Sequence, residues 1–574
     1  MIKFLDLITE HLQDAFEASG YPKEGITASL SNRPDLCEYQ CNGAMVLAKK
    51  VHQAPMEIAE KVAHVLLDNP AFEMAEAVKP GFINLKVTGR FLTEYIGNMV
   101  REEKFGLDNE EPKQMILVDY GGANVAKPLH IGHLRAAIIG ESIKRICRYM
   151  GHDVLGDVHL GDWGLQMGQV IAELILRGME DNFTVTDLEE IYPTASKKCK
   201  EESDTYDKAF AEEAHRITGE LQNGNAQYRK IWEKITEVSK EDLKKNYDNL
   251  EVYFDLWKGE SDVQPYIPAM IQDLKDQGLA YESDGAYVID VTEETDKKEL
   301  PPCIIVKRDG SSLYATTDLA TLVEREKLYC PDYVIYVVDK RQSLHLEQVF
   351  RVSRKAHIVH EGEKLFHLGF GTMNGKDGQP YKTRSGGVMR LESLINEVNE
   401  AVLEKMKDNP DISAEEAAKT SKVIALAALK YGDLSNQATK DYIFDISRFI
   451  EFEGNTGPYI LYTIVRIKSI LNKAGKEADG EIFFTGEKAE KGLLMEAARF
   501  SDVIETAYKE LAPHKICSYI YDLANAFNTF YHEVKILSEE DEKKKESYLS
   551  LLKLTKEVLE QCIDLLGFGA PERM

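Results

Sequence analysis

The chain has 574 residues, which is too long for one hydrophobic core, so we expect several domains. Hydrophobic residues make up 43% and charged residues 29%, as in ordinary globular proteins, and no apolar stretch predicts a membrane partner. The 97 acidic residues outnumber the 70 basic ones, giving a net charge of −27, which argues against a general nucleic-acid coat protein. A local basic face that meets RNA stays possible.

The N-terminal sequence and the pattern of cysteines both favour a cytoplasmic protein. The first ten residues include acids and lack a secretory pattern. Only Cys37 and Cys41 form a close pair, and no second pair has zinc-ligand spacing. We therefore expect reduced thiols and no metal site. The eight cysteines are Cys37, Cys41, Cys147, Cys199, Cys303, Cys330, Cys517 and Cys562.

Residues 1–110 are predicted to form a small separate α/β module. Phe4, Ile8, Leu12 and Phe16 recur at helical spacing. A second helix is expected over 55–67, and a strand over 81–87, before a polar linker at 105–113.

Residues 111–413 alternate strand and helix patterns, which is typical of a parallel α/β domain. Strands are expected at 115–118, 152–160, 286–290, 303–306 and 333–338. Residues 178–298 are mainly charged and helical, including 197–215 and 228–253, and indicate an insertion between two halves of one sheet.

Residues 414–574 are predicted to be an all-helical bundle. Helices are expected at 414–431, 459–471, 489–508, 515–532 and 548–566. The fold class is therefore α/β with a small N-terminal α/β domain and a C-terminal helical bundle.

The stretch His130-Ile131-Gly132-His133 lies where a loop after the first strand of the central domain enters a helix. A helix N-terminus presents free N–H groups and a partial positive charge, so it accepts phosphate readily. Two histidines three residues apart can donate hydrogen bonds to one phosphoryl group. The same pair could instead only cap the helix.

The region from Gly122 to Arg135 resembles the HIGH region of class I aminoacyl-tRNA synthetases, in the form found in arginyl-tRNA synthetases. Further segments agree with that family in order and spacing and cover most of the chain: 159–166, 259–261, 309–318, 338–342, 382–386, 452–456 and 570–574.

The resemblance implies a Rossmann-like catalytic domain that makes arginyl-adenylate from arginine and ATP and transfers arginine to tRNA(Arg). It assigns catalysis to His130, His133 and Lys127. The ATP-binding residues would be His130, Gly132, His133, Lys127, Lys382, Arg384 and Ser385. Lys382-Thr383-Arg384-Ser385 departs from the Lys-Met-Ser-Lys loop of the wider class, and Lys127 could supply the missing charge. Either Lys382 or Arg384 would contact the triphosphate.

Recognition of arginine needs carboxylates, because a guanidinium is planar, permanently charged and suited to bidentate pairing. Matched to the family's pocket, Asp119 and Asp318 would hold the guanidinium and Tyr314 would line it. Asn124 and Gln342 would bind the α-carboxylate and α-amino ends.

The same resemblance implies partners outside the pocket. Magnesium would arrive with ATP rather than in a protein site, since it keeps waters and phosphate oxygens as ligands. Tyr459, Tyr462, Arg466 and Met574 would contact tRNA, and the N-terminal module would contact its elbow. The resemblance also suggests a monomer, and an adenylate step that waits for tRNA.

Two other functions compete with this reading. Another adenylate-forming enzyme with a His-x-Gly-His motif is one, but a cysteinyl enzyme would need clustered thiolates, and small nucleotidyltransferases lack the long helical C-terminus. A non-catalytic tRNA-binding relative is the other, and it predicts loss of His130, His133 or the pocket acids, all of which are present. An aminoacylation assay that requires arginine and tRNA separates the three.

Overall fold

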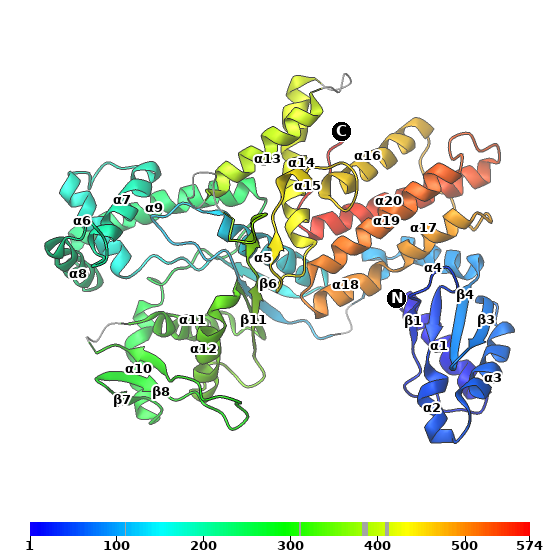
Figure 1. Cartoon of the computed structure of the whole chain (residues 1–574), viewed down its shortest axis with the longest axis horizontal. Coiled ribbons are helices and arrows are strands. Elements are labelled where there is room, and N and C mark those ends of the chain that lie inside the picture. Colours follow the sequence, from blue (N-terminus) through cyan, green and yellow to red (C-terminus); the bar gives the residue numbers. More distant parts are fainter. Residues whose placement is uncertain (109–110, 309–311, 382–388, 408–412) are drawn as a thin grey trace. The chain divides into compact units, whose positions relative to one another are not determined.

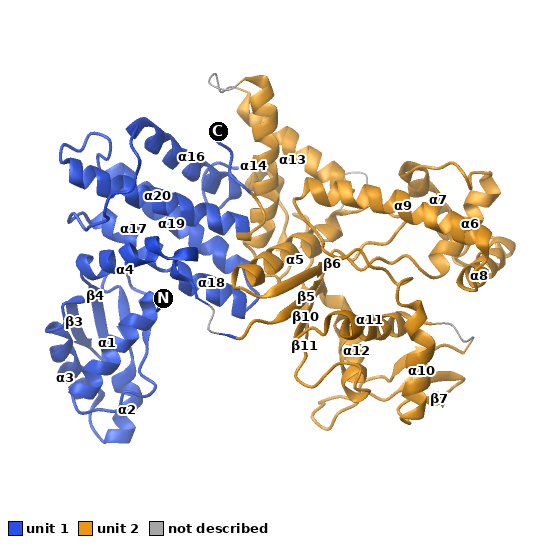
Figure 2. Ribbon diagram, turned by 180° about the vertical axis from the view of Figure 1, so that it is seen from behind, with its two compact units in different colours: residues 1–111, 451–564, 569–574 blue, residues 112–450, 565–568 orange. Residues whose placement is uncertain are grey.

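The structure is a computed structural model that describes residues 1–108, 111–308, 312–381, 389–407 and 413–574. Two compact units share the chain (Figure 2): residues 1–111, 451–564 and 569–574 form unit 1, and residues 112–450 and 565–568 form unit 2. The helices and strands of each are labelled in Figure 1. No helix in the described ranges has both the length and the apolar character needed to cross a bilayer.

Unit 2 is built around a four-stranded parallel sheet in the order β11-β10-β5-β6. Its strands are rich in buried Val, Ile and Leu, as expected for strands covered on both faces. The central strand β5 ends at Asp119, which is in register with Asp157 of β6 and Tyr336 of β10. The bounds are β5 Met115–Asp119, β6 Asp153–Asp157, β10 Tyr333–Asp339 and β11 Lys364–Phe370.

Helices cross between these parallel strands, because parallel neighbours need long connections. Helix α5 connects β5 to β6, and α12 lies between β10 and β11 in the chain. The other helices of unit 2 follow in order. Their bounds are α5 Ile131–Tyr149, α6 Leu165–Arg177, α7 Val185–Lys198, α8 Lys208–Gln222, α9 Ala226–Asn249, η2 Gln264–Tyr266, α10 Ile267–Asp276, α11 Tyr314–Tyr329, η3 Lys340–Gln342, α12 Ser343–Lys355, α13 Leu391–Met406, α14 Ala414–Leu434 and α15 Ile446–Phe449.

Two small sheets complete unit 2. A three-stranded antiparallel sheet, β7-β8-β9, contributes to a hydrophobic core shared with α10, α11, α12 and β10, in which Ile305, Leu319 and Val349 are fully buried. The strands are β7 Tyr281–Ser283, β8 Ala286–Ile289, β9 Cys303–Val306, β12 Met373–Asn374 and β13 Tyr442–Ile443, and β12 pairs with β13.

Unit 1 combines an antiparallel sheet of order β1-β2-β4-β3 with helices from both ends of the chain. Buried apolar residues such as Ile8, Val62 and Leu85 fill the N-terminal part. The strands are β1 Ala28–Leu30, β2 Tyr39–Cys41, β3 Phe72–Val78 and β4 Phe82–Val87. The helices are α1 Phe4–Ala18, α2 Gly43–Val51, α3 Pro55–Leu67, α4 Gly89–Arg101, η1 Glu103–Gly106, α16 Gly457–Ala474, α17 Lys488–Ala498, α18 Phe500–Lys509, α19 Pro513–Glu533 and α20 Glu542–Leu565.

The predicted fold class, α/β with a parallel-sheet domain and a helical C-terminus, is confirmed. Two helix predictions were wrong in detail. Residues 197–215 are interrupted after α7, and 489–508 are divided at Arg499 into α17 and α18. Helix α14, predicted to open the terminal bundle, belongs to unit 2, because its buried face packs on α13 and α5.

Candidate functional site

His130 and His133 form a reciprocal cap at the start of α5. The backbone N–H of Gly132 donates to His130 Nδ1 at 3.0 Å, and the backbone N–H of His130 donates to His133 Nδ1 at 3.1 Å. Since both Nδ1 atoms accept hydrogen bonds, the proton of each neutral ring is on Nε2. The two rings lie close together, with centroids 4.0 Å apart. Each histidine therefore keeps one N–H donor that the helix cap does not use.

Both histidines are neutral at physiological pH. Burial, followed by the charge of Lys127, lowers the pKa of His130. Burial, the neighbouring His130 and then Lys127 lower the pKa of His133 to about 3. Glycine is needed between the rings, because a Cβ at Gly132 would lie 2.8 Å from His130 Cε1. The arrangement gives two uncharged donors at the positive end of a helix dipole, which suits an anionic phosphoryl group.

Lys127 supplies the permanent positive charge next to this pair. Its Nζ lies over the ring of Tyr192, 4.5 Å from the centroid, and its charge acts on both histidines. Lys382, Arg384 and Ser385, expected to contact the triphosphate, lie outside the described residues.

The start of α11 carries two residues predicted to bind arginine. Tyr314 is 70% exposed at the helix start, and Asp318 follows one turn later. Burial and then the charge of Glu260 raise the pKa of Tyr314, with smaller effects from Tyr192 and Asp318. Tyr192, whose ring lies under Lys127 Nζ, thus also acts electrostatically on Tyr314.

Glu260 was given no role by the sequence analysis, although its segment Gly259-Glu260-Ser261 was recognised. Burial, followed by the charges of Asp318 and Asp162, raises its pKa to about 8. A buried acid that faces two other acids lacks a cation, and a guanidinium would supply one. Glycine precedes it because a Cβ at Gly259 would lie 2.7 Å from the Asp162 carboxylate. The backbone N–H of Glu260 donates to Leu160 at 3.0 Å, which holds this segment beside the sheet.

Asp318 has a partner within the protein. Its Oδ2 lies 2.5 Å from His345 Nε2 on α12. The charge of Asp318 also acts on Glu260 and Tyr314, and it raises the pKa of both. The role of Asp318 in binding a guanidinium stays a prediction.

Asp119 is engaged differently from the sequence-based expectation. Its Oδ2 accepts a hydrogen bond from Arg325 Nη2 at 2.5 Å, and the same nitrogen donates to Asp157 at 2.8 Å. Arg325 is 2% exposed. A guanidinium of the protein itself, carried on α11, therefore pairs with one oxygen of Asp119.

Asn124 and Gln342 follow two neighbouring parallel strands at the same edge of the sheet. Asn124 comes after β5 and forms a bridge with Gly161, and Gln342 ends η3 directly after β10. Ligands of open parallel sheets bind at this carboxyl edge. The backbone positions of both residues are thus at this edge, and their contact with arginine stays a prediction.

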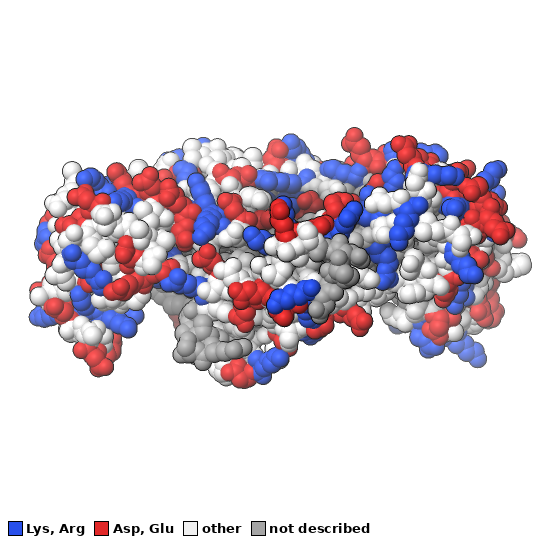
Figure 3. Space-filling model, turned by 90° about the horizontal axis from the view of Figure 1, so that it is seen from above, with Lys and Arg blue, Asp and Glu red and all other residues white. Residues whose placement is uncertain are grey.

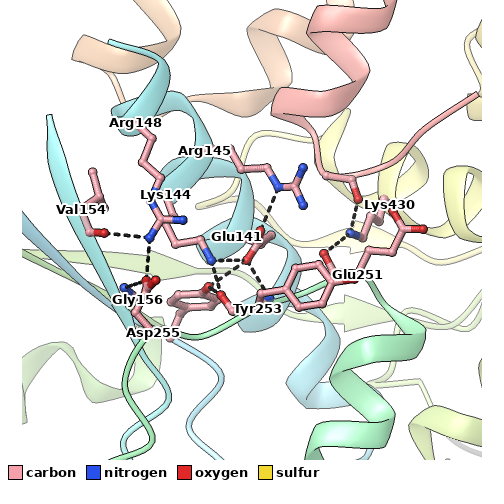
Figure 4. Close-up of polar contacts among 12 residues, drawn as sticks. Glu141, Lys144, Arg145, Arg148, Val154, Gly156, Glu251, Tyr253, Asp255 and Lys430 are labelled. Atoms are coloured by element: carbon pink, nitrogen blue, oxygen red, sulfur yellow. Dashed lines mark hydrogen bonds and ion pairs between the residues drawn. The ribbon is translucent and has the colours of Figure 1, made fainter. Parts of the chain in front are cut away.

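A buried network of ion pairs and hydrogen bonds holds α5 in place, further along the helix from the two histidines (Figure 4). Glu141 is 2% exposed and accepts hydrogen bonds from Tyr120 at 2.9 Å and from the backbone of Tyr253 at 3.1 Å. It also pairs with Lys144 and Arg145, each at 2.8 Å. Buried ion pairs of this kind fix geometry, because leaving one partner alone is costly.

The network continues to the segment after α9 and to the chain end. Arg148 pairs with Asp255 at 2.7 Å, and Lys430 donates to the carbonyl oxygens of Glu251 and Gly567. Burial lowers the pKa of Lys430 to about 7. The helix with the two histidines is thus connected to three distant segments of unit 2.

The residues predicted to meet tRNA lie in unit 1. Tyr459 and Arg466 of α16 both contact Asn528 of α19, at 2.8 Å each, and Arg466 also donates to the hydroxyl of Tyr462 at 3.0 Å. Tyr462 is 40% exposed, and the Arg466 guanidinium lies over its ring, 4.6 Å from the centroid. Met574 is the last residue of the chain and is partly exposed.

Comparison with known proteins identifies the three regions. Residues 96–446 match the family tRNA synthetases class I (R), catalytic domain; residues 460–574 match the DALR anticodon binding domain; and residues 3–87 match the arginyl tRNA synthetase N terminal domain. The matched ranges include the residues of unit 2 named above and also Tyr462, Arg466 and Met574, whereas Tyr459 lies just before the second range begins.

Relatives of the whole chain agree with the domain matches. The arginine–tRNA ligase of Agathobacter rectalis is 55% identical over 100% of both chains, and that of Alkaliphilus oremlandii is 52% identical over 99% of both. The crystal structure of arginyl-tRNA synthetase from Plasmodium falciparum superposes with a TM-score of 0.84 at 26% identity over 100% of both chains. The Thermus thermophilus arginyl-tRNA synthetase shares the fold, with a TM-score of 0.80 at 22% identity over 100% of both chains. The chain belongs to the arginyl-tRNA synthetases, the class I ligases that attach arginine to its tRNA.

Proposed function

We propose that this protein activates L-arginine with ATP at the N-terminus of α5 and transfers it from the adenylate to tRNA(Arg). The observation that carries the proposal is the presence of two sets of polar groups in unit 2. Two neutral histidine donors and Lys127 lie at the start of α5, and the acids Glu260 and Asp318 act electrostatically on each other and on Tyr314 at the start of α11. The first group suits a phosphoryl anion and the second a guanidinium.

The chemistry needs no protein nucleophile. The arginine carboxylate attacks the α-phosphorus of ATP, a P–O bond forms, and the bond to pyrophosphate breaks as that group leaves. Charge on the phosphoryl oxygens is stabilised by the Nε2–H donors of His130 and His133 and by Lys127. Lys382, Arg384 and Ser385 are proposed to bind the leaving pyrophosphate, and magnesium is proposed to arrive with ATP.

The arginine side chain is proposed to lie between Glu260 and Asp318, with Tyr314 over it. Carboxylates on two sides discriminate against lysine, which lacks the planar fork of donors. Asp119 then acts indirectly, by pairing with Arg325 of α11 and so positioning that helix. This proposal replaces the direct contact with the arginine guanidinium that was expected from the sequence. Asn124 and Gln342 are proposed to bind the α-carboxylate and α-amino groups.

Contact with tRNA is proposed for Tyr459, Tyr462, Arg466 and Met574 of unit 1, through base stacking and phosphate contact. On the face shown in Figure 3, lysine and arginine side chains are interspersed with acidic ones, so local basic groups rather than net charge would meet the phosphates. We also propose a monomer that works in the cytoplasm, where tRNA is charged for protein synthesis.

Steady-state kinetics test the pocket. Glu260→Gln and Asp318→Asn should each raise the KM for arginine by about 10- to 150-fold, the effect of losing a hydrogen bond between charged groups, and leave the KM for ATP nearly unchanged. The matched control is Glu282→Gln, an exposed acid on β7, which should leave both constants unchanged. An unchanged KM for arginine in the two pocket variants would contradict the proposed pocket.

The order of the two steps is tested by ATP–pyrophosphate exchange with and without tRNA(Arg). We propose that adenylate formation waits for tRNA, so exchange should appear only when tRNA is added. Equal exchange in both reactions would reject this order.

A further inference from the structure

Four side chains outside the catalytic site gather at the far end of α11. Glu326 lies in the last turn of that helix, and Cys330 is its C-cap, in a left-handed conformation with a φ of 45°. His360 and Glu363 lie in the loop before β11. We call Glu326, Cys330, His360 and Glu363 the α11 cluster. The proposed function uses none of them.

The distances within the α11 cluster match those between ligands of one metal ion. His360 Nδ1 is 3.2 Å from Glu326, Cys330 Sγ is 3.8 Å from Glu326 Oε1, and Cys330 Sγ is 3.9 Å from His360 Nδ1. Ligands at about 2.0–2.3 Å from a tetrahedral zinc ion are roughly 3.3–3.7 Å apart from one another. Small side-chain adjustments would therefore bring these atoms to one centre.

Glu363 supplies an independent observation. The residue is 7% exposed, and its Oε2 atom receives no hydrogen bond from any residue in the described ranges. That oxygen lies 3.5 Å from His360 Nδ1, so it faces the cluster. A buried oxygen without a hydrogen-bond donor is costly, and a cation between the four groups would satisfy it.

The charges favour a cation at the same place. Glu326 and Glu363 bring two carboxylates to His360 Nδ1, at 3.2 Å and 3.5 Å. Carboxylates this close together repel each other, and a divalent ion between them would stabilise both.

We propose that Glu326, Cys330, His360 and Glu363 form a binding site for a divalent transition metal of the zinc type. The donor set of one sulfur, one imidazole nitrogen and two carboxylate oxygens suits zinc, whereas magnesium and calcium prefer oxygen ligands alone. This proposal departs from the expectation of no metal site. That expectation rested on paired cysteines, whereas this set has one cysteine in a pattern of Glu-x3-Cys and His-x2-Glu.

A metal here would have a structural consequence. It would fasten the C-terminal end of α11 to the loop that leads into β11. The opposite end of α11 carries Tyr314 and Asp318 of the proposed arginine pocket. The metal site itself does not depend on the assignment of that pocket.

Metal binding to the full-length protein tests the proposal. The protein is first freed of metal with a chelator under reducing conditions, and zinc is then titrated in competition with a chromophoric chelator. We expect one equivalent to bind, and the affinity to fall at least tenfold in Cys330→Ser and in His360→Gln. The matched control is Cys199→Ser, a partly exposed cysteine that caps α7, which should bind as the wild type does.

Cobalt binding supplies a second, spectroscopic readout that does not depend on enzyme activity. A cobalt-substituted protein should show tetrahedral d–d bands and a thiolate-to-metal charge-transfer band, and Cys330→Ser should lose the latter. Zinc should also raise the melting temperature of the wild type but not that of the variant. The proposal is overturned if the wild type and Cys199→Ser bind zinc no more tightly than Cys330→Ser, or if bound cobalt shows no thiolate band.

Discussion

The affinity for arginine should increase steeply with pH, because Glu260 must be ionised to pair with a guanidinium. Burial and the charges of Asp318 and Asp162 raise the pKa of Glu260 to about 8. Below that pH the carboxyl group of Glu260 is mostly protonated, so it must lose a proton before arginine can bind. The dissociation constant then falls as pH rises through 8 and becomes constant above it. For one group of this pKa, arginine should bind roughly 80-fold more tightly at pH 8.5 than at pH 6.

Isothermal titration calorimetry measures both the affinity for arginine and the number of protons released when it binds. Titrations in buffers of different ionisation enthalpy should show about 0.9 proton released per arginine bound at pH 7. Glu260→Gln should bind more weakly above pH 8 and lose the dependence on pH. A wild-type affinity that changes less than about threefold over this range, or the same pH profile in Glu260→Gln, would refute the argument.

Three further predictions concern α5 and its loop. His130→Asn keeps a capping oxygen but loses the Nε2–H donor. The single-turnover rate of adenylate formation should therefore fall by about 10²- to 10³-fold, without a change in melting temperature. An unchanged rate would contradict the proposed role of His130. Lys127→Met should raise the KM for ATP by about tenfold and Lys127→Arg should restore most of it, whereas equal kinetics in both variants would show that the charge is not used. Glu141→Ala removes the ion-pair partner of the buried Lys144 and should lower the free energy of unfolding in urea by about 3–5 kcal/mol. The exposed control Glu94→Ala should lower it by about 0.5 kcal/mol or less. Similar losses in both variants would contradict a stabilising role for the buried network.

The parts of the site that follow local rules could be predicted from the sequence. The loop, helix start and histidine pair of 130–133 lie within a few residues of one another, and α5 begins at Ile131 as expected. The apolar patterns of β5, β6 and β10 likewise predicted the central strands of the parallel sheet. Such features depend on spacing and capping, which a single sequence contains.

Long-range pairing accounts for what could not be predicted. Asp119 is occupied by Arg325, which is 206 positions away, and no local signal marks that arginine as its partner. Glu260 reaches Asp318 only because the backbone of 259–260 joins Leu160, about 100 residues earlier. In the same way, Glu326 and Cys330 meet His360 only after α12 returns the chain to the sheet.

Short strands and helix breaks were missed for a different reason. Strands β1 and β2 have three residues each; β1 pairs with β2, and β2 in turn pairs with β4, so their own sequence carries little alternation. The break between α17 and α18 at Arg499 has no proline or glycine to mark it. Tertiary packing decides both features.

A crystal structure with L-arginine bound would test the central claim most directly. The account predicts a guanidinium within hydrogen-bonding distance of the carboxylates of both Glu260 and Asp318, with the pair of Asp119 and Arg325 intact. A guanidinium bound to Asp119, with Arg325 displaced and Glu260 without contact to the ligand, would contradict it.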